Sequence, residues 1–280
     1  MTVPRFVAVG HVVQDLVPGG WRLGGTVTFA AVQARRLGQS VGVVTVAGPE
    51  LELPLRLPEV QLHARDDGTT QFRNVYLDGE RVQEAPSRAG PIAPHDIPEA
   101  WLGAPIALVG PVCGEAPPEL ASSFRSELVG VSAQGWLRNV GSDGRVRRVA
   151  WRGEPFWRGA HVLVVSDEDV EPDPSQVHRW AEEVPIVALT LARRGARIHA
   201  GGAWLTVPAF PCEEVDPTGA GDVFAAAFLV RYRETNEVRE AMRFAAAAAS
   251  LAVSAPGVDG IGGREEIEAV IRRYPEVEVA

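Results

Sequence analysis

The stretch that most constrains this chain lies near its C-terminal end, where residues 216–222 read Asp-Pro-Thr-Gly-Ala-Gly-Asp and an apolar segment follows at 223–230. A loop of small residues that runs into an apolar segment of helical length predicts a helix N-terminus within 218–222. The first backbone N–H groups of such a helix have no intrahelical partner, and the helix macrodipole adds partial positive charge. The stretch is therefore suited to holding an anion such as a phosphate.

Asp222 would lie beside the place where that negative charge gathers, which suggests a proton acceptor close to a phosphoryl group. Gly219 and Gly221 allow the close approach and the unusual backbone angles that a cradle needs. An acidic first turn on an ordinary core helix explains the same residues equally well, because Asp is common there. The two carboxylates that flank Gly-Ala-Gly favour a binding site.

Composition narrows the choice of function. The 280 residues are 46% hydrophobic and 22% charged, which is ordinary for a soluble globular protein and enough for one large α/β domain. The formal net charge of −9 argues against nucleic acid or an anionic membrane as the main partner. Two cysteines cannot build a disulfide framework or a zinc site, and no signal peptide or apolar run of about 18 residues occurs. We expect a cytoplasmic protein.

The chain contains no lysine, so every basic residue that carries a fixed charge is an arginine. A phosphate-binding loop of the Walker type, a Schiff-base lysine and the strand lysine of protein kinases are all excluded. Any phosphate that this protein binds must be held by backbone amides, arginine or a metal ion.

Apolar runs typical of buried strands alternate with helical patterns along the chain, at residues 5–10, 41–47, 106–110, 128–131, 161–166 and 185–190. This order predicts a mostly parallel sheet covered by helices on both faces. Residues 51–82 differ, because short alternating runs there are joined by Asp66-Asp67-Gly68 and Asp78-Gly79, which are hairpin signals.

The heptapeptide 216–222 resembles the C-terminal signature of the ribokinase-like (PfkB) family of sugar, polyol and nucleoside kinases. The resemblance covers nearly the whole chain in the right order. It implies a three-layer α/β sandwich, one kinase domain over residues 1–280, and a small β lid formed from parts of 11–23 and 60–85. Lid sheets in this family often pair between subunits, so a homodimer is one implied arrangement.

The resemblance also implies the chemistry. The backbone of Gly219, Ala220 and Gly221 would form the anion hole for the transferred phosphate, with Thr218 beside the nucleotide. Asp222 would deprotonate the attacking hydroxyl. The implied ligands are ATP with Mg²⁺ and a small polyhydroxylated substrate.

Two further positions are implied in substrate binding. Asp15 follows five residues after Gly10, where a family Asp binds substrate hydroxyls, although it could simply cap a turn. Its carboxylate suits the role because it can accept two hydrogen bonds from vicinal hydroxyls. Gly24 and Gly25 match the glycine pair of the family. The family Asn four residues later is Phe29 here, which offers either a stacking wall for the substrate or ordinary core packing.

The pattern of residues 10–15 and 23–29 resembles the plant-type myo-inositol kinase branch, as does the stretch Ala-Gln-Gly-Trp-Leu-Arg at 133–138. Arg138 could there reach an anion, while Trp136 is more often a packing residue. A cyclic polyol such as inositol is therefore the first choice of substrate, and a furanose sugar or nucleoside the second.

The residues that would bind ATP and its metal ion match the family less closely. The family carries Asn-x-x-Glu after a central strand, and Ser166 and Asp169 stand there, so Asp169 would reach the metal through water or else cap a helix. Of the family turn Thr-x-Gly-x-x-Gly, Thr190 and Gly195 match and Ala192 replaces the middle Gly.

The alanine-rich segment 237–254 would flank the adenine, through Ala246 (an Asn in many relatives) and Ser250, although its small residues also suit close helix packing.

Two other functions are alternatives to a kinase: a sugar-binding regulator and an oxidoreductase. A non-catalytic sugar-binding regulator on this fold is kept open by Phe29, Ser166, Ala192 and Ala246, whereas the intact Asp222 argues against it. A nicotinamide-dependent oxidoreductase would need Gly-x-Gly-x-x-Gly after the first strand, which is missing.

Overall fold

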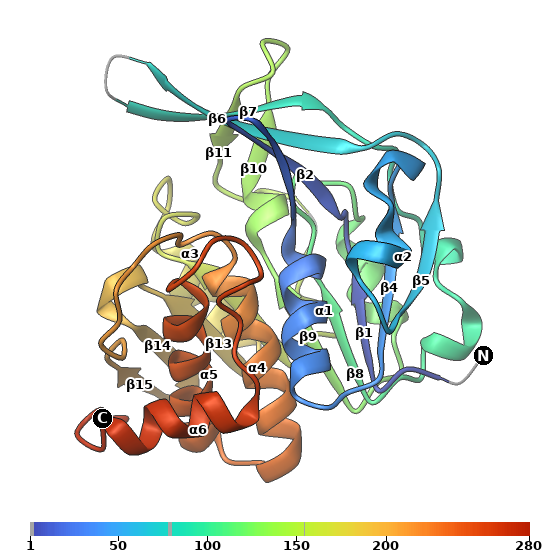
Figure 1. Ribbon diagram of the computed structural model, residues 1–280. Coiled ribbons are helices and arrows are strands. Elements are labelled where there is room, and N and C mark those ends of the chain that lie inside the picture. The colour runs from blue at the N-terminus through green and yellow to red at the C-terminus, as the bar shows by residue number, and fades with distance from the viewer. Residues whose placement is uncertain (1–2, 78–79, 154) are drawn as a thin grey trace.

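A nine-stranded sheet forms the body of the protein in the computed structural model, which describes residues 3–77, 80–153 and 155–280 (Figure 1). Its strand order is β15-β14-β13-β12-β9-β8-β1-β4-β5. The strands are β1 (Phe6–Val9), β4 (Val41–Val46), β5 (Val60–Arg65), β8 (Ile106–Val109), β9 (Leu128–Ser132), β12 (Val162–Ser166), β13 (Ile186–Thr190), β14 (Ala196–Ala200) and β15 (Ala203–Val207). All neighbours from β5 to β13 pair in parallel, and β14 and β15 continue the sheet antiparallel. The predicted mostly parallel α/β sheet is confirmed.

Helices cover both faces because successive strand residues point to opposite sides of the sheet. On β1, Phe6 and Ala8 pack into one cluster with α1 (Thr26–Arg36), α4 (Ala220–Thr235) and α5 (Val238–Ala252). Val7 and Val9 pack on the other side with the cluster that includes α3 (Gln176–Glu183).

The remaining helices are short or peripheral: α2 (Leu53–Arg56), α6 (Arg264–Arg273), and 3₁₀ turns at Pro49–Leu51, Pro94–Asp96, Glu99–Trp101, Pro118–Ser123, Gln134–Leu137 and Ala192–Arg194. No helix within the described residues is long and apolar enough to cross a membrane.

A second, four-stranded sheet lies over one end of the body, in the order β3-β2-β6-β7 (Figure 1). Its strands are β2 (Val13–Val17), β3 (Gly20–Gly24), β6 (Thr70–Leu77) and β7 (Glu80–Ser87). Beside it, β10 (Arg138–Val140) and β11 (Val146–Arg148) form a two-stranded hairpin, and Arg145 makes an isolated bridge to Glu84 of β7.

The segment 60–87 divides between the two sheets. β5 pairs in parallel with β4 in the large sheet, whereas β6 pairs with β2 and β7 in the small one. The hairpin predicted at Asp66-Asp67-Gly68 is therefore wrong: this turn carries the chain from one sheet to the other. The predicted turn at Asp78-Gly79 lies outside the described residues, between the antiparallel strands β6 and β7.

Candidate active site

A cavity of about 1240 Å³ lies at the carboxyl ends of the parallel strands, the edge at which open α/β sheets bind ligands. Residues of β2, β6 and β7 line one part of it, and the starts of α1 and α4 line another. Single small-ligand pockets usually measure about 300–1,000 Å³, so this volume suits a site for two small ligands.

The predicted anion-binding turn adopts its expected form. α4 begins at Ala220, and its N-cap Gly219 has φ 79°, the left-handed region that glycine favours. Asp216 shapes the turn, because its carboxylate accepts from the backbone N–H groups of Thr218 (3.0 Å) and Gly257 (3.2 Å).

Three amides at the start of α4 remain available. In the described chain the N–H groups of Gly219, Gly221 and Asp222 make no hydrogen bond, whereas that of Ala220 donates to Pro217 O at 3.3 Å. Gly221 has only Thr190 Oγ1 within 4 Å of a Cβ built on it, at 4.0 Å, so its surroundings are open. The free donors of the turn thus include the N–H groups of Gly219 and Gly221 from the predicted Gly-Ala-Gly backbone, and that of Asp222 in addition.

Asp222 is half-buried at the wall of the cavity. Burial raises the pKa of its carboxyl to about 7, with smaller contributions in the same direction from Asp169 and Asp15. The Thr26 hydroxyl and the Arg138 guanidinium act against this rise in the pKa. A carboxyl whose pKa lies near neutrality is suited to accept a proton at physiological pH.

Asp15 lies on β2, and its carboxylate covers Gly24 of the neighbouring strand β3. A Cβ on Gly24 would lie 1.9 Å from Asp15 Oδ2. At Gly25, φ is 88° and a Cβ would lie 2.4 Å from the His11 carbonyl oxygen. Gly24 is therefore required by the packing of Asp15, and Gly25 by its positive φ and its close approach to His11. Asp15 and Gly25 line the cavity.

The side chain of Phe29 packs against the anion-binding turn at Gly219. This side chain is 2% exposed, and a Cβ on Gly219 would lie 2.2 Å from Phe29 Cδ1. Phe29 also lies at the edge of the cavity lining. Of the two interpretations left open by the sequence, this geometry favours packing.

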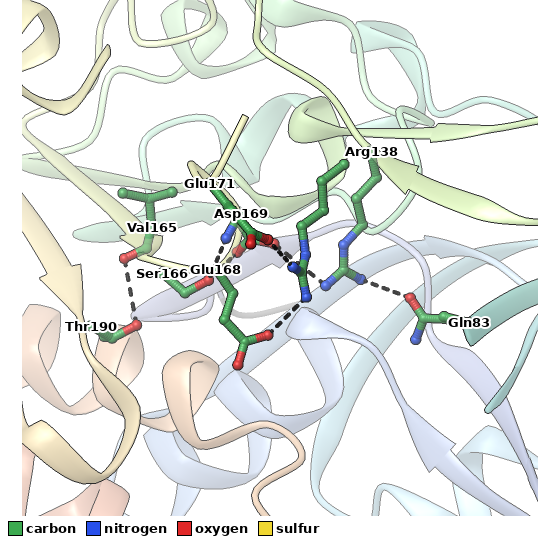
Figure 2. Close-up of polar contacts among 9 residues, drawn as sticks. Gln83, Arg138, Val165, Ser166, Glu168, Asp169, Glu171 and Thr190 are labelled. Carbon is green, nitrogen blue, oxygen red and sulfur yellow. Dashed lines mark hydrogen bonds and ion pairs between the residues drawn. The ribbon is translucent and has the colours of Figure 1, made fainter. Parts of the chain in front are cut away.

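Arg138 and Asp169 form a buried ion pair at the junction of the hairpin and the large sheet (Figure 2). Arg138 Nη2 lies 3.5 Å from Asp169 Oδ1, and its Nη1 donates to Gln83 Oε1 at 3.3 Å. Burial lowers the pKa of the Arg138 guanidinium, while Asp169 and Asp222 oppose the shift. The Ser166 hydroxyl donates to Asp169 Oδ2 at 2.6 Å.

The other acidic residues after β12 are occupied by surface arginines. Arg148 of β11 pairs with Glu168 (3.0 Å) and Glu171 (2.6 Å), which ties the hairpin to the loop after β12. Asp167 pairs with Arg194. Asp169, 4% exposed, is the buried carboxylate of this loop.

Oxygen donors at this place suit a hydrated Mg²⁺, which keeps several water ligands and takes one or two carboxylates. Because both oxygens of Asp169 already face Ser166 and Arg138, contact through water fits the donor set better than direct ligation.

The donor-side residues also line the cavity. Thr190 ends β13, and Gly195 has φ 94° with no room for a Cβ, which would lie 2.0 Å from Val207 O. Ala192, which stands where the family has a glycine, has φ 50°, in the left-handed region that favours glycine. Ala246 and Ser250 line the cavity from α5, and Ser250 Oγ accepts from the Phe210 N–H at 3.1 Å.

Thr26, Gln83 and Gln134 also line the cavity, and sequence reasoning did not select them. Thr26 follows the glycine pair directly and Gln134 belongs to the 133–138 stretch, so both had a signal nearby. Gln83 comes from β7, where no motif marks it.

A second polar cluster lies next to Val112, a residue of the cavity lining whose N–H donates to the carboxylate of Glu115. The ligand atoms of His11, Cys113 and Glu115 lie within 4.8 Å of one another. Both ring nitrogens of His11 are hydrogen-bonded, Nε2 to Gly90 O (2.9 Å) and Nδ1 to Thr70 Oγ1 (2.8 Å). Burial raises the pKa of the Cys113 thiol to about 12. The cluster is a structural hydrogen-bond network, because a metal would need these groups deprotonated and free.

Comparison with known proteins shows similarity to carbohydrate and nucleoside kinases. Residues 158–261 match the family described as pfkB family carbohydrate kinase. The chain is 43% identical to the ribokinase of Bacillus subtilis (strain 168) over 84 residues, 30% of this chain and 29% of that protein. It is 26% identical to the cytidine kinase of Thermococcus kodakarensis over 85% of this chain and 91% of that protein. It is 29% identical to the inositol 3-kinase of Oryza sativa subsp. japonica over 79% of this chain and 61% of that protein.

Among solved structures, a pyrophosphate-dependent kinase of the ribokinase family, complexed with a pyrophosphate analogue and myo-inositol, has the same fold. The TM-score is 0.79 at 24% identity, covering 94% of this chain and 99% of that one. Residues 158–261, which include the glycine-lined helix start and the acid beside it, thus match the pfkB family of carbohydrate kinases, and the described chain has the fold of a ribokinase-family structure.

Proposed function

We propose that this kinase transfers the γ-phosphate of ATP to a hydroxyl of a small polyol or sugar, with an inositol-like cyclic polyol as the first choice. The observation that carries the proposal is the meeting of Asp15 and Asp222 at one cavity. Asp15 contributes to the raised pKa of Asp222, and the two carboxylates come from the small sheet and from the start of α4. One acid can hold the acceptor while the other takes its proton.

At the acceptor end, Asp15 would accept hydrogen bonds from two substrate hydroxyls. Gln83 and Arg138, which are hydrogen-bonded to each other, line the same cavity and would donate hydrogen bonds to the substrate. Phe72 and Val112 would form an apolar wall. A ring with several hydroxyls and one apolar face fits these surroundings.

Phosphoryl transfer depends mainly on positioning and on electrostatic stabilisation of the moving group. Asp222 would accept the proton of the attacking hydroxyl. The free N–H groups of Gly221 and Asp222, at the positive end of the α4 dipole, would stabilise charge on the phosphoryl oxygens. Gly219 would hold this turn in place through its contact with Phe29.

The small side chains of Ala246, Ala249 and Ser250 leave room on the donor side for a flat base, which favours ATP as the donor. Thr190 and Gly195 would lie along the phosphates. Asp169 with Ser166 would hold the water ligands of Mg²⁺, and the metal would neutralise part of the phosphate charge.

Inositol is preferred among acceptors because inositol 3-kinases of three plants are 29–30% identical to this chain over 57–81% of its length. The cytidine kinase relative makes a nucleoside the principal alternative. The chain spans less than two thirds of the length of several of these relatives, so the acceptor itself is a matter for experiment.

The test is a panel assay with purified protein. myo-Inositol, ribose, fructose and cytidine are each offered with ATP and Mg²⁺, with pyrophosphate as a parallel donor, and phosphorylated product is followed by mass spectrometry. We expect ADP-forming turnover with myo-inositol, lowered by about 10²–10⁴ in Asp222→Asn. Acceptor binding by calorimetry without turnover on either donor would instead support a sugar-binding regulator, and turnover with pyrophosphate alone would overturn the choice of donor.

We further propose that the enzyme works in the cytoplasm, since Cys113 and Cys212 are both free thiols. A homodimer formed through the small sheet β3-β2-β6-β7 is proposed from the resemblance to the family. Light scattering coupled to size exclusion would test it, and a monomer at micromolar concentration would refute it.

A further inference from the structure

Thr26, the first residue of α1, carries a buried hydroxyl beside the proposed base. The residue is 1% exposed and belongs to the cavity lining. Its Oγ1 has no hydrogen-bond partner in the described part of the chain, and Asp222, at the start of the neighbouring helix α4, lines the same cavity. The Thr26 hydroxyl lowers the pKa of the Asp222 carboxyl. Unpaired buried hydroxyls are costly and uncommon in native proteins, so this one calls for a functional reason.

The direction of this hydroxyl is fixed by the packing of the methyl group on the same carbon. A Cβ built on Gly110, just after β8, would lie 2.3 Å from Thr26 Cγ2, so the methyl group fills the space that a larger residue would need. A β-branched side chain in a helix has few rotamers, and a methyl held in this way sets the hydroxyl as well. The scaffold therefore fixes the donor before any substrate arrives.

The starts of two helices meet here. Gly219, the N-cap of α4, contacts Phe29 of α1, and Thr26 lies one turn before Phe29. The charged groups that act on Asp222 come from other elements: Asp15 from β2, Arg138 from β10, and Asp169 from the loop after β12. Arg138 is itself paired with Asp169, whereas the neutral Thr26 hydroxyl has no partner of its own in the described residues.

We propose that Thr26 is the positioning residue for the base: its hydroxyl donates to one carboxylate oxygen of Asp222 and so turns the other oxygen toward the acceptor hydroxyl. The proposal rests on the proposed function, in which Asp222 takes the proton. The acceptor oxygen forms the new bond to phosphorus as the bond from phosphorus to the bridging oxygen of the donor breaks. The acceptor proton moves to Asp222, and Thr26 keeps its own.

Three variants test this. Thr26→Val removes the hydroxyl but keeps the branched shape that packs on Gly110, and Thr26→Ser keeps the hydroxyl. Thr28→Val is the matched control, because Thr28 lies in the same helix and its buried hydroxyl donates to Gly24 O at 2.6 Å. Loss of a hydrogen bond to a charged group predicts a fall in kcat of about 10- to 100-fold in Thr26→Val, with KM changed less than about 3-fold.

The readout that does not depend on turnover is the titration of the Asp222 carboxyl by carbon-13 NMR, with the signal assigned by its loss in Asp222→Asn. We expect the pKa of Asp222 to rise in Thr26→Val and to stay near the wild-type value in Thr26→Ser and Thr28→Val. The acid limb of the kcat profile should move in the same direction as the pKa.

An unchanged pKa of Asp222 in Thr26→Val overturns the proposal, and so does a raised pKa with full kcat. If the wild-type protein phosphorylates nothing on the panel, the proposed function fails, whereas the NMR titration still decides whether Thr26 holds Asp222. The two failures are therefore distinguishable.

Discussion

Replacing Gly219 by alanine tests the structural basis of the anion turn. The residue has φ 79°, and the left-handed region costs an L-residue with a Cβ about 1–2 kcal/mol. The new Cβ would also lie 2.2 Å from the Phe29 ring, and overpacking of this kind costs about 1–3 kcal/mol. The lower entropy of the unfolded alanine chain returns about 0.4–1 kcal/mol. The expected loss in the free energy of unfolding is therefore about 1–5 kcal/mol.

Gly221→Ala is the matched control, since it lies two residues on, inside α4, with no atom closer than 4.0 Å to its Cβ. It should leave stability unchanged or raise it by up to about 1 kcal/mol. Urea unfolding followed by tryptophan fluorescence measures both. Adding Phe29→Leu to Gly219→Ala should recover at least about 1 kcal/mol relative to the sum of the single changes. Equal stability of Gly219→Ala and Gly221→Ala, or strict additivity with Phe29→Leu, would refute this account of the turn.

Four further outcomes follow from particular contacts. Asp222→Asn should lower kcat by about 10²–10⁴, and in the wild type kcat/KM should fall as pH drops below about 7, because the base must be ionised and burial raises its pKa to about 7. The same raised pKa makes the ionised carboxyl destabilising, so Asp222→Asn should be more stable than the wild type at pH 8, by a margin that shrinks toward pH 4; a constant margin in thermal melts would contradict it. Ala192→Gly should raise stability by up to about 1 kcal/mol, because it relieves a left-handed φ of 50°, and a lower melting temperature would count against that strain. Glu115→Ala should cost about 3 kcal/mol or more, because the carboxylate accepts three buried backbone N–H groups, while the exposed Glu119→Ala should change urea stability by less than about 0.5 kcal/mol; comparable losses in the two would exclude the network as the cause.

Residues 216–230 could be interpreted from sequence because their structure is local. Glycine at Gly219 permits a left-handed turn whatever its surroundings, and the apolar run behind it can only be a buried helix in a chain of this size. The alternation of apolar strands and helices likewise requires a parallel sheet, because parallel strands need crossover connections. The resemblance to the PfkB family further implied a small β lid and the roles of the site residues.

The segment 60–65 shows where local pattern fails. Its alternating side chains suit a hairpin strand and an edge strand equally, and the choice between β4 and β6 as partner depends on residues far away in the sequence. The role of Phe29 could not be predicted from sequence for a similar reason, because an aromatic residue on a helix face can line a cavity or pack against a turn. The contact of Phe29 with Gly219 in the folded chain favours packing.

The chain by itself thus determined the sheet, the anion turn and the acids placed around it, since backbone conformation and burial periodicity are written in neighbouring residues. Only the tertiary structure decided that Asp15, Asp222 and the buried Thr26 meet at one cavity, and that Asp169 is held by Arg138 and Ser166. These are electrostatic and packing relations between distant segments. They depend on distance and desolvation, which a linear sequence does not contain.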